Sequence, residues 1–309
     1  MLSTSRITRA LVGVVAAVLA SAALTGAAPP AAATTAQAAR PSGHHGSGHR
    51  GAGHGKEYYV SLGDSLSVGF QPNVDRNTSA SYPDQLFAKL RKHDPNLVHV
   101  SFGCSGETTQ TMIGGGICSY RGAASQLAAA VGFLAAHRGQ VRLVTLDIGA
   151  NDVDGCAVGN TLNLTCAEQG ITAVGTELPQ IAQRLRAAGG PRPQYIGMNY
   201  YDPFLVAWLG GAAGQQQARE SVTLSTAFNG AIQAGLHSSG FELADVSRTF
   251  ATDDFTRQVG VPGLGELPVN VAHVCEWTWE CTKYVNIHAN TLGYSVIAGV
   301  FRRVVERRR

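Results

Sequence analysis

Stretches rich in β-branched residues alternate with helix-like stretches from residue 57 onward, and this alternation constrains the fold more than any other feature. Several of the expected strands are apolar on both faces, as buried parallel strands are. The expected strands are 58–62, 97–102, 141–148, 194–199 and 241–246, and the expected helices are 82–93, 123–137, 168–188, 215–237 and one that begins near residue 291. The pattern predicts a doubly wound three-layer α/β/α domain over residues 57–309, with a mainly parallel sheet of about five strands.

The N-terminal segment has the pattern of a secretory signal peptide. Arg6 and Arg9 precede a run of apolar and small residues at 11–24, and small residues at 36–39 form a cleavage-like site. A transmembrane anchor is the alternative, but the apolar run is shorter than the roughly 20 residues that a membrane span needs. We therefore expect residues 1–39 to be a signal peptide, the mature protein to be extracellular, and no stable membrane insertion.

Residues 40–56 are dominated by Gly, Ser and His and have no apolar period, so they are expected to form a flexible linker. Four histidines at positions 44, 45, 49 and 54 offer a loose site for a transition metal. A solvated low-complexity segment is the favoured interpretation.

The six cysteines, Cys104, Cys118, Cys156, Cys166, Cys275 and Cys281, all lie beyond the expected signal peptide. An even number of cysteines in an exported chain indicates disulfides. Six cysteines allow 15 connectivities, which the count alone leaves open. Because the cysteines fall into three local pairs, we predict the bridges 104–118, 156–166 and 275–281. A zinc site is disfavoured, since no pair has the spacing of a structural zinc site.

The near balance of charges says little about partners, but no segment resembles a nucleic-acid-binding patch. The chain carries 24 basic and 21 acidic residues, and two of the basic residues belong to the expected signal peptide. Aromatic residues and cations do not interleave, and the arginine cluster at 302–309 is confined to one terminal segment. We expect a monomer whose partner is an ester or lipid substrate.

Four polar motifs follow the expected strands or precede the last helix, and ligands of such sheets bind beyond the carboxyl ends of the strands. The motifs are GDSL with Ser65, GCSGETT with Gly106, GAND with Asn151 and NIHAN with His288. Taken alone, the first three have structural alternatives: a helix N-cap serine, a turn set by a disulfide, and an Asx turn. Their order along the chain, with three of them at successive strand ends, favours a shared site.

Together these motifs resemble those of the SGNH (GDSL) hydrolase family, and the resemblance covers residues 58–301. The cysteine pattern and the segment 275–281 are similar to secreted esterases, lipases and phospholipases of high-GC Gram-positive bacteria. The resemblance implies a serine carboxylic ester hydrolase in which Ser65 is the nucleophile and His288 the general base. It also implies an oxyanion hole made by the N–H groups of Ser65 and Gly106 and the amide of Asn151, and no metal or organic cofactor.

One position departs from the family pattern. Most members carry an aspartate three residues before the histidine, where this chain has Val285, and Asn286 is not an acid either. Some secreted relatives orient the imidazole with a main-chain carbonyl, and the carbonyl of Asn286 is the candidate here. Asp64, Asp147 and Asp152 lie near the expected site and are interpreted as structural, and His273 is a weaker alternative base.

Two other functions remain open from the sequence. One is a polysaccharide O-acetyl esterase that uses the same residues, and the other is a surface-binding protein that has lost catalysis together with its acid. Acyl-chain preference is not readable from the sequence, because loops build the acyl pocket.

Overall fold

The computed structural model of the chain describes residues 55–158 and 161–308. The predicted signal peptide and residues 40–54 of the predicted linker lie outside the described residues. Within the described ranges, none of the helices combines the length and apolar character that crossing a membrane requires.

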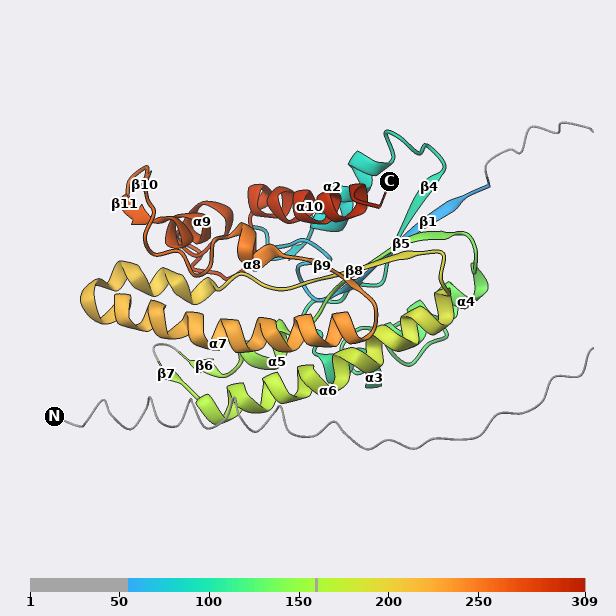
Figure 1. Cartoon of the computed structure of the whole chain (residues 1–309), viewed down its shortest axis with the longest axis horizontal. Coiled ribbons are helices and arrows are strands. Elements are labelled where there is room, and N and C mark those ends of the chain that lie inside the picture. The colour runs from blue at the N-terminus through green and yellow to red at the C-terminus, as the bar shows by residue number, and fades with distance from the viewer. Residues whose placement is uncertain (1–54, 159–160, 309) are drawn as a thin grey trace, which may run out of the picture. The chain divides into compact units, whose positions relative to one another are not determined.

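The centre of the domain is a five-stranded sheet in which every paired strand is parallel (Figure 1). The strands are β1 (Glu57–Gly63), β4 (Leu97–Ser101), β5 (Val141–Asp147), β8 (Gln194–Met198) and β9 (Glu242–Ala244). They lie in the order β4-β1-β5-β8-β9. The predicted strand positions and the parallel sheet are confirmed.

Helices cover both faces of this sheet, as the predicted three-layer architecture requires (Figure 1). On one face α2 (Tyr82–Leu90) packs against α10 (Thr291–Glu306). On the other face α6 (Leu164–Gly189) packs between α4 (Gln126–Ala136) and α7 (Gly211–Ser238). The stacked rings of Tyr82 and Phe301, 4.6 Å apart, join α2 to α10 in the buried core.

Shorter elements extend this framework at the ends of the strands and helices. They are β2 (Phe70–Gln71), β3 (Arg76–Asn77), α3 (Thr109–Gly114), α5 (Ala150–Asp154), β6 (Ala157–Val158), β7 (Thr161–Leu162), the 3-10 helix η1 (Pro203–Gly210), α8 (Val246–Thr249), β10 (Gln258–Val261), β11 (Gly265–Pro268) and α9 (Val269–Trp277). The sequence patterns did not predict η1, the β10–β11 hairpin or α9.

Polar caps explain where two of the helices begin. The Ser81 hydroxyl accepts the Asp84 N–H at 3.1 Å at the start of α2, and Pro83 occupies the first turn, where no N–H is required. At the start of α10 the Asn290 side chain accepts the Gly293 N–H at 3.0 Å. This cap ends the loop that carries His288, so the beginning of α10 also fixes the end of that loop.

The strand order reverses at β1, and this reversal locates the crevice. β1 pairs with β4 on one side and with β5 on the other. The first crossover runs from β1 toward one edge of the sheet, and the later strands β5, β8 and β9 add toward the other edge. Ligands of doubly wound sheets bind outside the carboxyl ends of the strands at such a reversal. Ser65 follows β1 and Asn151 follows β5, so both lie at this point.

All six cysteines form disulfides with the predicted local pairing, Cys104–Cys118, Cys156–Cys166 and Cys275–Cys281. The zinc alternative is therefore wrong. Each bridge braces a segment next to the site: the loop after β4, the junction of α5 with α6, and the junction of α9 with the His288 loop. Closing a loop of about 15 residues contributes about 3 kcal/mol to stability.

Candidate active site

The turn after β1 holds Ser65 in a fixed position. Gly63 has φ +147°, and a Cβ there would lie 2.3 Å from the Asp147 carbonyl oxygen, so the turn requires glycine. The buried carboxyl of Asp64 accepts the Leu66 N–H at 2.9 Å and the Tyr200 hydroxyl at 2.8 Å. These bonds fix the backbone on both sides of Ser65 and leave its hydroxyl half-buried at the crevice.

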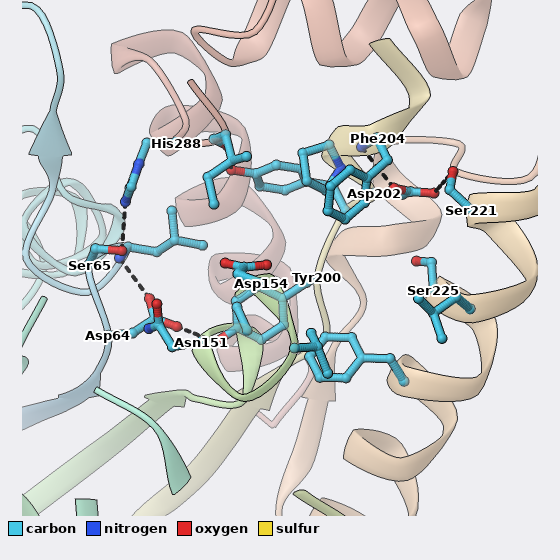
Figure 2. A pocket seen from close by; sticks show the side chains of 18 residues that line it. Asp64, Ser65, Asn151, Asp154, Tyr200, Asp202, Phe204, Ser221, Ser225 and His288 are labelled. Atoms are coloured by element: carbon cyan, nitrogen blue, oxygen red, sulfur yellow. Dashed lines mark hydrogen bonds between the residues drawn. The ribbon is translucent and has the colours of Figure 1, made fainter. Parts of the chain in front are cut away.

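His288 reaches Ser65 across 223 positions of sequence. Its Nε2 lies 2.7 Å from the Ser65 Oγ (Figure 2). Its Nδ1 lies 2.7 Å from the Asn286 Oδ1. The His288 backbone N–H donates to the same Oδ1 at 3.1 Å. Because a backbone N–H only donates, that Asn286 atom is the acceptor oxygen, and Nδ1 carries the ring proton. Nε2 is then free to accept the Ser65 proton.

The predicted role of the Asn286 main-chain carbonyl is wrong: the side-chain oxygen orients the imidazole instead. The cause is local. Asn286 accepts the N–H two residues further on, which is an Asx turn, and this turn brings its Oδ1 next to the ring. Val285, at the position usual for the acid, is 71% exposed and has φ +42°, a conformation that costs a β-branched residue free energy.

Three successive carbonyls fix the His288 loop. The carbonyls of residues 287–289 accept hydrogen bonds from the Tyr201 hydroxyl at 2.6 Å, the Trp279 N–H at 3.0 Å and the Gln71 side chain at 2.9 Å, in that order. The Phe70 ring packs 4.7 Å from the imidazole. This support lets the ring keep its orientation without a carboxylate.

Burial lowers the pKa of His288 to about 4. The imidazole is therefore neutral at neutral pH, which is the state that a general base needs. No carboxylate among the described residues is hydrogen-bonded to Nδ1, so nothing raises that pKa again.

The expected oxyanion groups lie on two turns that are joined to each other. Gly106, with φ +83°, follows β4, and Asn151 lies in the first turn of α5. The Asn151 Nδ2 donates to the Glu107 carbonyl at 2.9 Å, so one amide hydrogen is used and the second remains for a ligand. Asn151 lines the same pocket as Ser65 and His288, whereas Gly106 does not line it.

Gln126 connects these turns, and the sequence motifs did not reveal it. Its side chain accepts the Gly63 N–H at 2.7 Å and donates to the Glu107 carboxylate at 2.9 Å, entirely inside the protein. The segments after β1 and β4 are thereby tied together. The sequence signal was only a polar residue on the buried face of α4.

The three aspartates near the site have structural partners. Asp64 closes the Ser65 turn, Asp147 accepts the Tyr82 hydroxyl at 2.6 Å, and Asp152 accepts both the N–H and the hydroxyl of Thr109, at 2.9 and 2.6 Å. Desolvation raises the pKa of each of these carboxyl groups. The Nδ1 of the alternative base His273 lies 3.0 Å from the Phe250 carbonyl oxygen, and no hydrogen bond joins His273 to a serine among the described residues.

The family match decides the identity of the fold. Residues 61–296 match the model of the GDSL-like lipase/acylhydrolase family. The chain belongs to this family. The hydrolase is similar in fold to the extracellular lipase of Streptomyces rimosus, with 21% identity and a TM-score of 0.52 over 80% of this chain and 99% of that one.

Two further solved structures share the fold of this hydrolase. The phospholipase A1 of Streptomyces albidoflavus NA297 is 16% identical, with a TM-score of 0.50 over 80% of this chain and 99% of that one. A putative GDSL-like lipase of Parabacteroides merdae is 14% identical, with a TM-score of 0.50 over 82% of this chain and 96% of that one. No curated protein matches the sequence.

A pocket of the hydrolase extends from Ser65 and His288 toward α7 (Figure 2). Its empty volume is about 770 Å³, which includes space open to solvent. Leu66, Val153, Leu224 and Phe228 are among its apolar lining residues. Within the described residues, no group of three or more His, Cys, Asp or Glu side chains is arranged as a metal site.

The sequence motifs did not predict many of the residues that line this pocket. Tyr200, Tyr201, Asp202 and Phe204 line it and directly follow β8. They lie at the carboxyl end of a strand, so the rule that located Ser65 and Asn151 would also have found them. The α7 residues carry no such signal, because only packing shows which face of that helix lines the pocket.

The Asn286 contact leads to a prediction about pH. Asn286→Asp supplies a carboxylate that stabilises the imidazolium, so the pKa of His288 should rise by about 1–3 units. Activity requires the neutral ring, so the acid limb of the pH profile of kcat/KM should move to higher pH by the same amount. Asn286→Ala removes the acceptor and should lower kcat by about 10–100-fold.

Both variants are compared with the native enzyme by pH profiles of kcat/KM and by melting temperature. Asn286→Ala retaining full activity, together with an unshifted acid limb in Asn286→Asp, would show that the main-chain carbonyl orients the ring after all.

Proposed function

We propose that the protein is a secreted serine carboxylic ester hydrolase that forms an acyl-enzyme on Ser65. The observation that carries this proposal is the contact of 2.7 Å between the Ser65 Oγ and the His288 Nε2, in an imidazole whose Nδ1–H is bound by Asn286. A serine and a neutral imidazole in this arrangement are what nucleophilic catalysis requires.

In the first half-reaction the Ser65 Oγ attacks the ester carbonyl carbon while His288 takes the hydroxyl proton. The oxyanion is stabilised by the N–H groups of Ser65 and Gly106 and the free amide hydrogen of Asn151, each worth about 10²–10³-fold in kcat. The intermediate collapses, the C–O bond to the alcohol breaks, and His288 gives its proton to the departing oxygen.

In the second half-reaction water replaces the alcohol. His288 takes a proton from water, the resulting hydroxide attacks the acyl-enzyme, and a second oxyanion forms at the same donors. Its collapse returns the proton to the Ser65 Oγ and releases the carboxylic acid. Asn286 holds the imidazole in one tautomer through both steps.

Secretion is supported by the signal-like segment at 1–39 and by three disulfides, which persist in oxidising compartments. The extracellular lipase of S. rimosus, with its similar fold, is consistent with this location.

The pocket favours an acyl or alcohol group larger than acetyl, because it extends from Ser65 to α7 and its lining includes the apolar side chains of Leu66, Val153, Leu224 and Phe228. We therefore expect kcat/KM to rise about 10–100-fold from nitrophenyl acetate to medium-chain nitrophenyl esters, since each buried CH₂ contributes about 0.8 kcal/mol.

A panel of nitrophenyl esters of increasing chain length, assayed with the purified protein, tests this proposal. Preference for the acetate would favour the O-acetyl esterase alternative. No hydrolysis of any ester would favour the non-catalytic binding protein.

A further inference from the structure

One carboxyl group that lines the pocket has no role in the reaction described above. Asp154, the last residue of α5, lines the pocket, and in the view of Figure 2 its carboxyl group lies between the Ser65–His288 pair and the hydrogen-bonded Asp202–Ser221 pair. It forms no hydrogen bond or ion pair with any described residue.

Another acid of the pocket, Asp202, shows how a carboxyl group with hydrogen-bond partners is held here. Asp202 accepts the Phe204 N–H at 2.9 Å and the Ser221 hydroxyl at 2.6 Å. Those bonds occupy both of its oxygens and fix the start of η1 against α7. Asp154 has no comparable bonds, so its oxygens remain available to whatever enters the pocket.

The surroundings of Asp154 disfavour a bare negative charge. Burial, followed by repulsion from Asp64 and Asp152, raises the pKa of Asp154 to about 7. A polar group left unpaired in an apolar wall costs free energy, and a charge costs more. A cation bound beside it would remove that cost.

The other walls of the pocket also suit a cation. Tyr200, Tyr201, Phe204 and Phe228 supply aromatic rings, and the rings of Tyr200 and Phe228 lie 5.7 Å apart. The faces of aromatic rings attract ammonium groups, and quaternary ammonium ligands are commonly bound in aromatic cages. Among the described lining residues no lysine or arginine competes for the Asp154 carboxylate.

We propose that Asp154 determines specificity by pairing with an ammonium group of the substrate, so that the hydrolase prefers esters whose pocket-bound part carries a cation. This inference rests on the proposed ester hydrolysis at Ser65. The cation can belong to the alcohol, as in a choline-type ester, or to the acyl chain, and the experiment separates these two sources.

Two matched pairs of esters provide the test. In the alcohol pair, butyrylcholine is compared with 3,3-dimethylbutyl butyrate, in which carbon replaces the charged nitrogen. In the acyl pair, the nitrophenyl ester of 4-(trimethylammonio)butanoic acid is compared with that of 5,5-dimethylhexanoic acid. Each pair differs in charge and hardly in shape, so the ratio of kcat/KM values reports recognition of the cation.

In the native enzyme the cationic ester of one pair should be favoured about tenfold or more at about pH 8, as for a desolvated cation–π and ion-pair contact. Asp154→Asn should lower that ratio several-fold, because it removes the ion pair and leaves the aromatic rings in place. Asp253→Asn removes an exposed carboxylate elsewhere and is the matched control, in which the ratio should keep its native value.

The ratio should also rise between about pH 6 and pH 8, because Asp154 becomes ionised over this range and a quaternary ammonium does not titrate. Dividing the kcat/KM of the cationic ester by that of the neutral ester removes pH effects that both substrates share. The titratable groups around Asp154 are Asp64, Asp152, Tyr200, Tyr201, Asp202 and His288.

Asp154→Asn should fold. An acid whose pKa is raised in the native state destabilises that state at any pH above the ordinary carboxyl pKa, and the substitution removes this acid. Its melting temperature is measured alongside the native enzyme. The preference of the native enzyme and its pH dependence test the inference without any variant.

Ratios near unity in both pairs for the native enzyme, or a cation preference that keeps its native size in Asp154→Asn, would overturn the inference. In either case hydrolysis of the neutral esters would leave the proposed function intact. If the native enzyme hydrolysed none of the four esters, both the proposed function and this inference would be contradicted.

Discussion

Ser65→Ala should lower kcat/KM for every ester that the native enzyme hydrolyses by about 10⁴-fold or more, without loss of the fold. The variant removes the proposed nucleophile, the Oγ that lies 2.7 Å from the His288 Nε2. The turn itself is held by the Asp64 carboxyl and the backbone, so the substitution removes no hydrogen bond that supports it.

Activity is measured on nitrophenyl esters, and folding by circular dichroism and melting temperature. Ser238→Ala, an exposed serine near the end of α7, is the matched control and should behave as the native enzyme does. Retention of more than a few per cent of native turnover by a homogeneous Ser65→Ala sample would remove Ser65 from the nucleophile role.

His288→Ala should lower kcat by a similar factor, about 10³–10⁶-fold, because Ser65 loses the base that accepts its proton. The effects of substituting residues that act as one unit do not add. The double variant Ser65→Ala/His288→Ala should therefore be no less active than the less active of the two single variants. Added imidazole should restore part of the activity of His288→Ala, since the missing ring leaves a space beside Ser65.

His273→Ala is the control for this variant, because His273 was the alternative base in the sequence and its ring is bound to the Phe250 carbonyl. We expect its turnover to change only as far as its stability does. A loss at His273 as large as that at His288, in a protein that melts normally, would reverse the two assignments.

Hydrophobic periodicity was sufficient to predict the central sheet. Strands such as Val141–Asp147 are largely buried on both faces, and their positions agree with the prediction to within one or two residues. α9 shows where periodicity fails: its sequence VNVAHVCEW is rich in β-branched residues, which favours a strand. The segment is helical because its buried side chains pack against η1 and α10, and tertiary packing outweighs the local preference.

The site was predicted in part. The motifs around Ser65 and His288 indicated two residues that meet although 223 positions separate them. For Asn286 the residue was predicted and the atom was not, because the choice between its carbonyl and its side chain depends on a single Asx turn. Motif reasoning did not reveal Asp154, since the meaning of a carboxyl group depends on whether the fold gives it a partner.

The most direct test of the central claim is intact-mass analysis after reaction with a fluorophosphonate, which phosphonylates an activated serine. The account predicts one adduct per chain, mapped by peptide sequencing to Ser65, with no adduct in Ser65→Ala and greatly slowed labelling in His288→Ala. An adduct on another residue, or an active enzyme that the reagent neither labels nor inhibits, would contradict it.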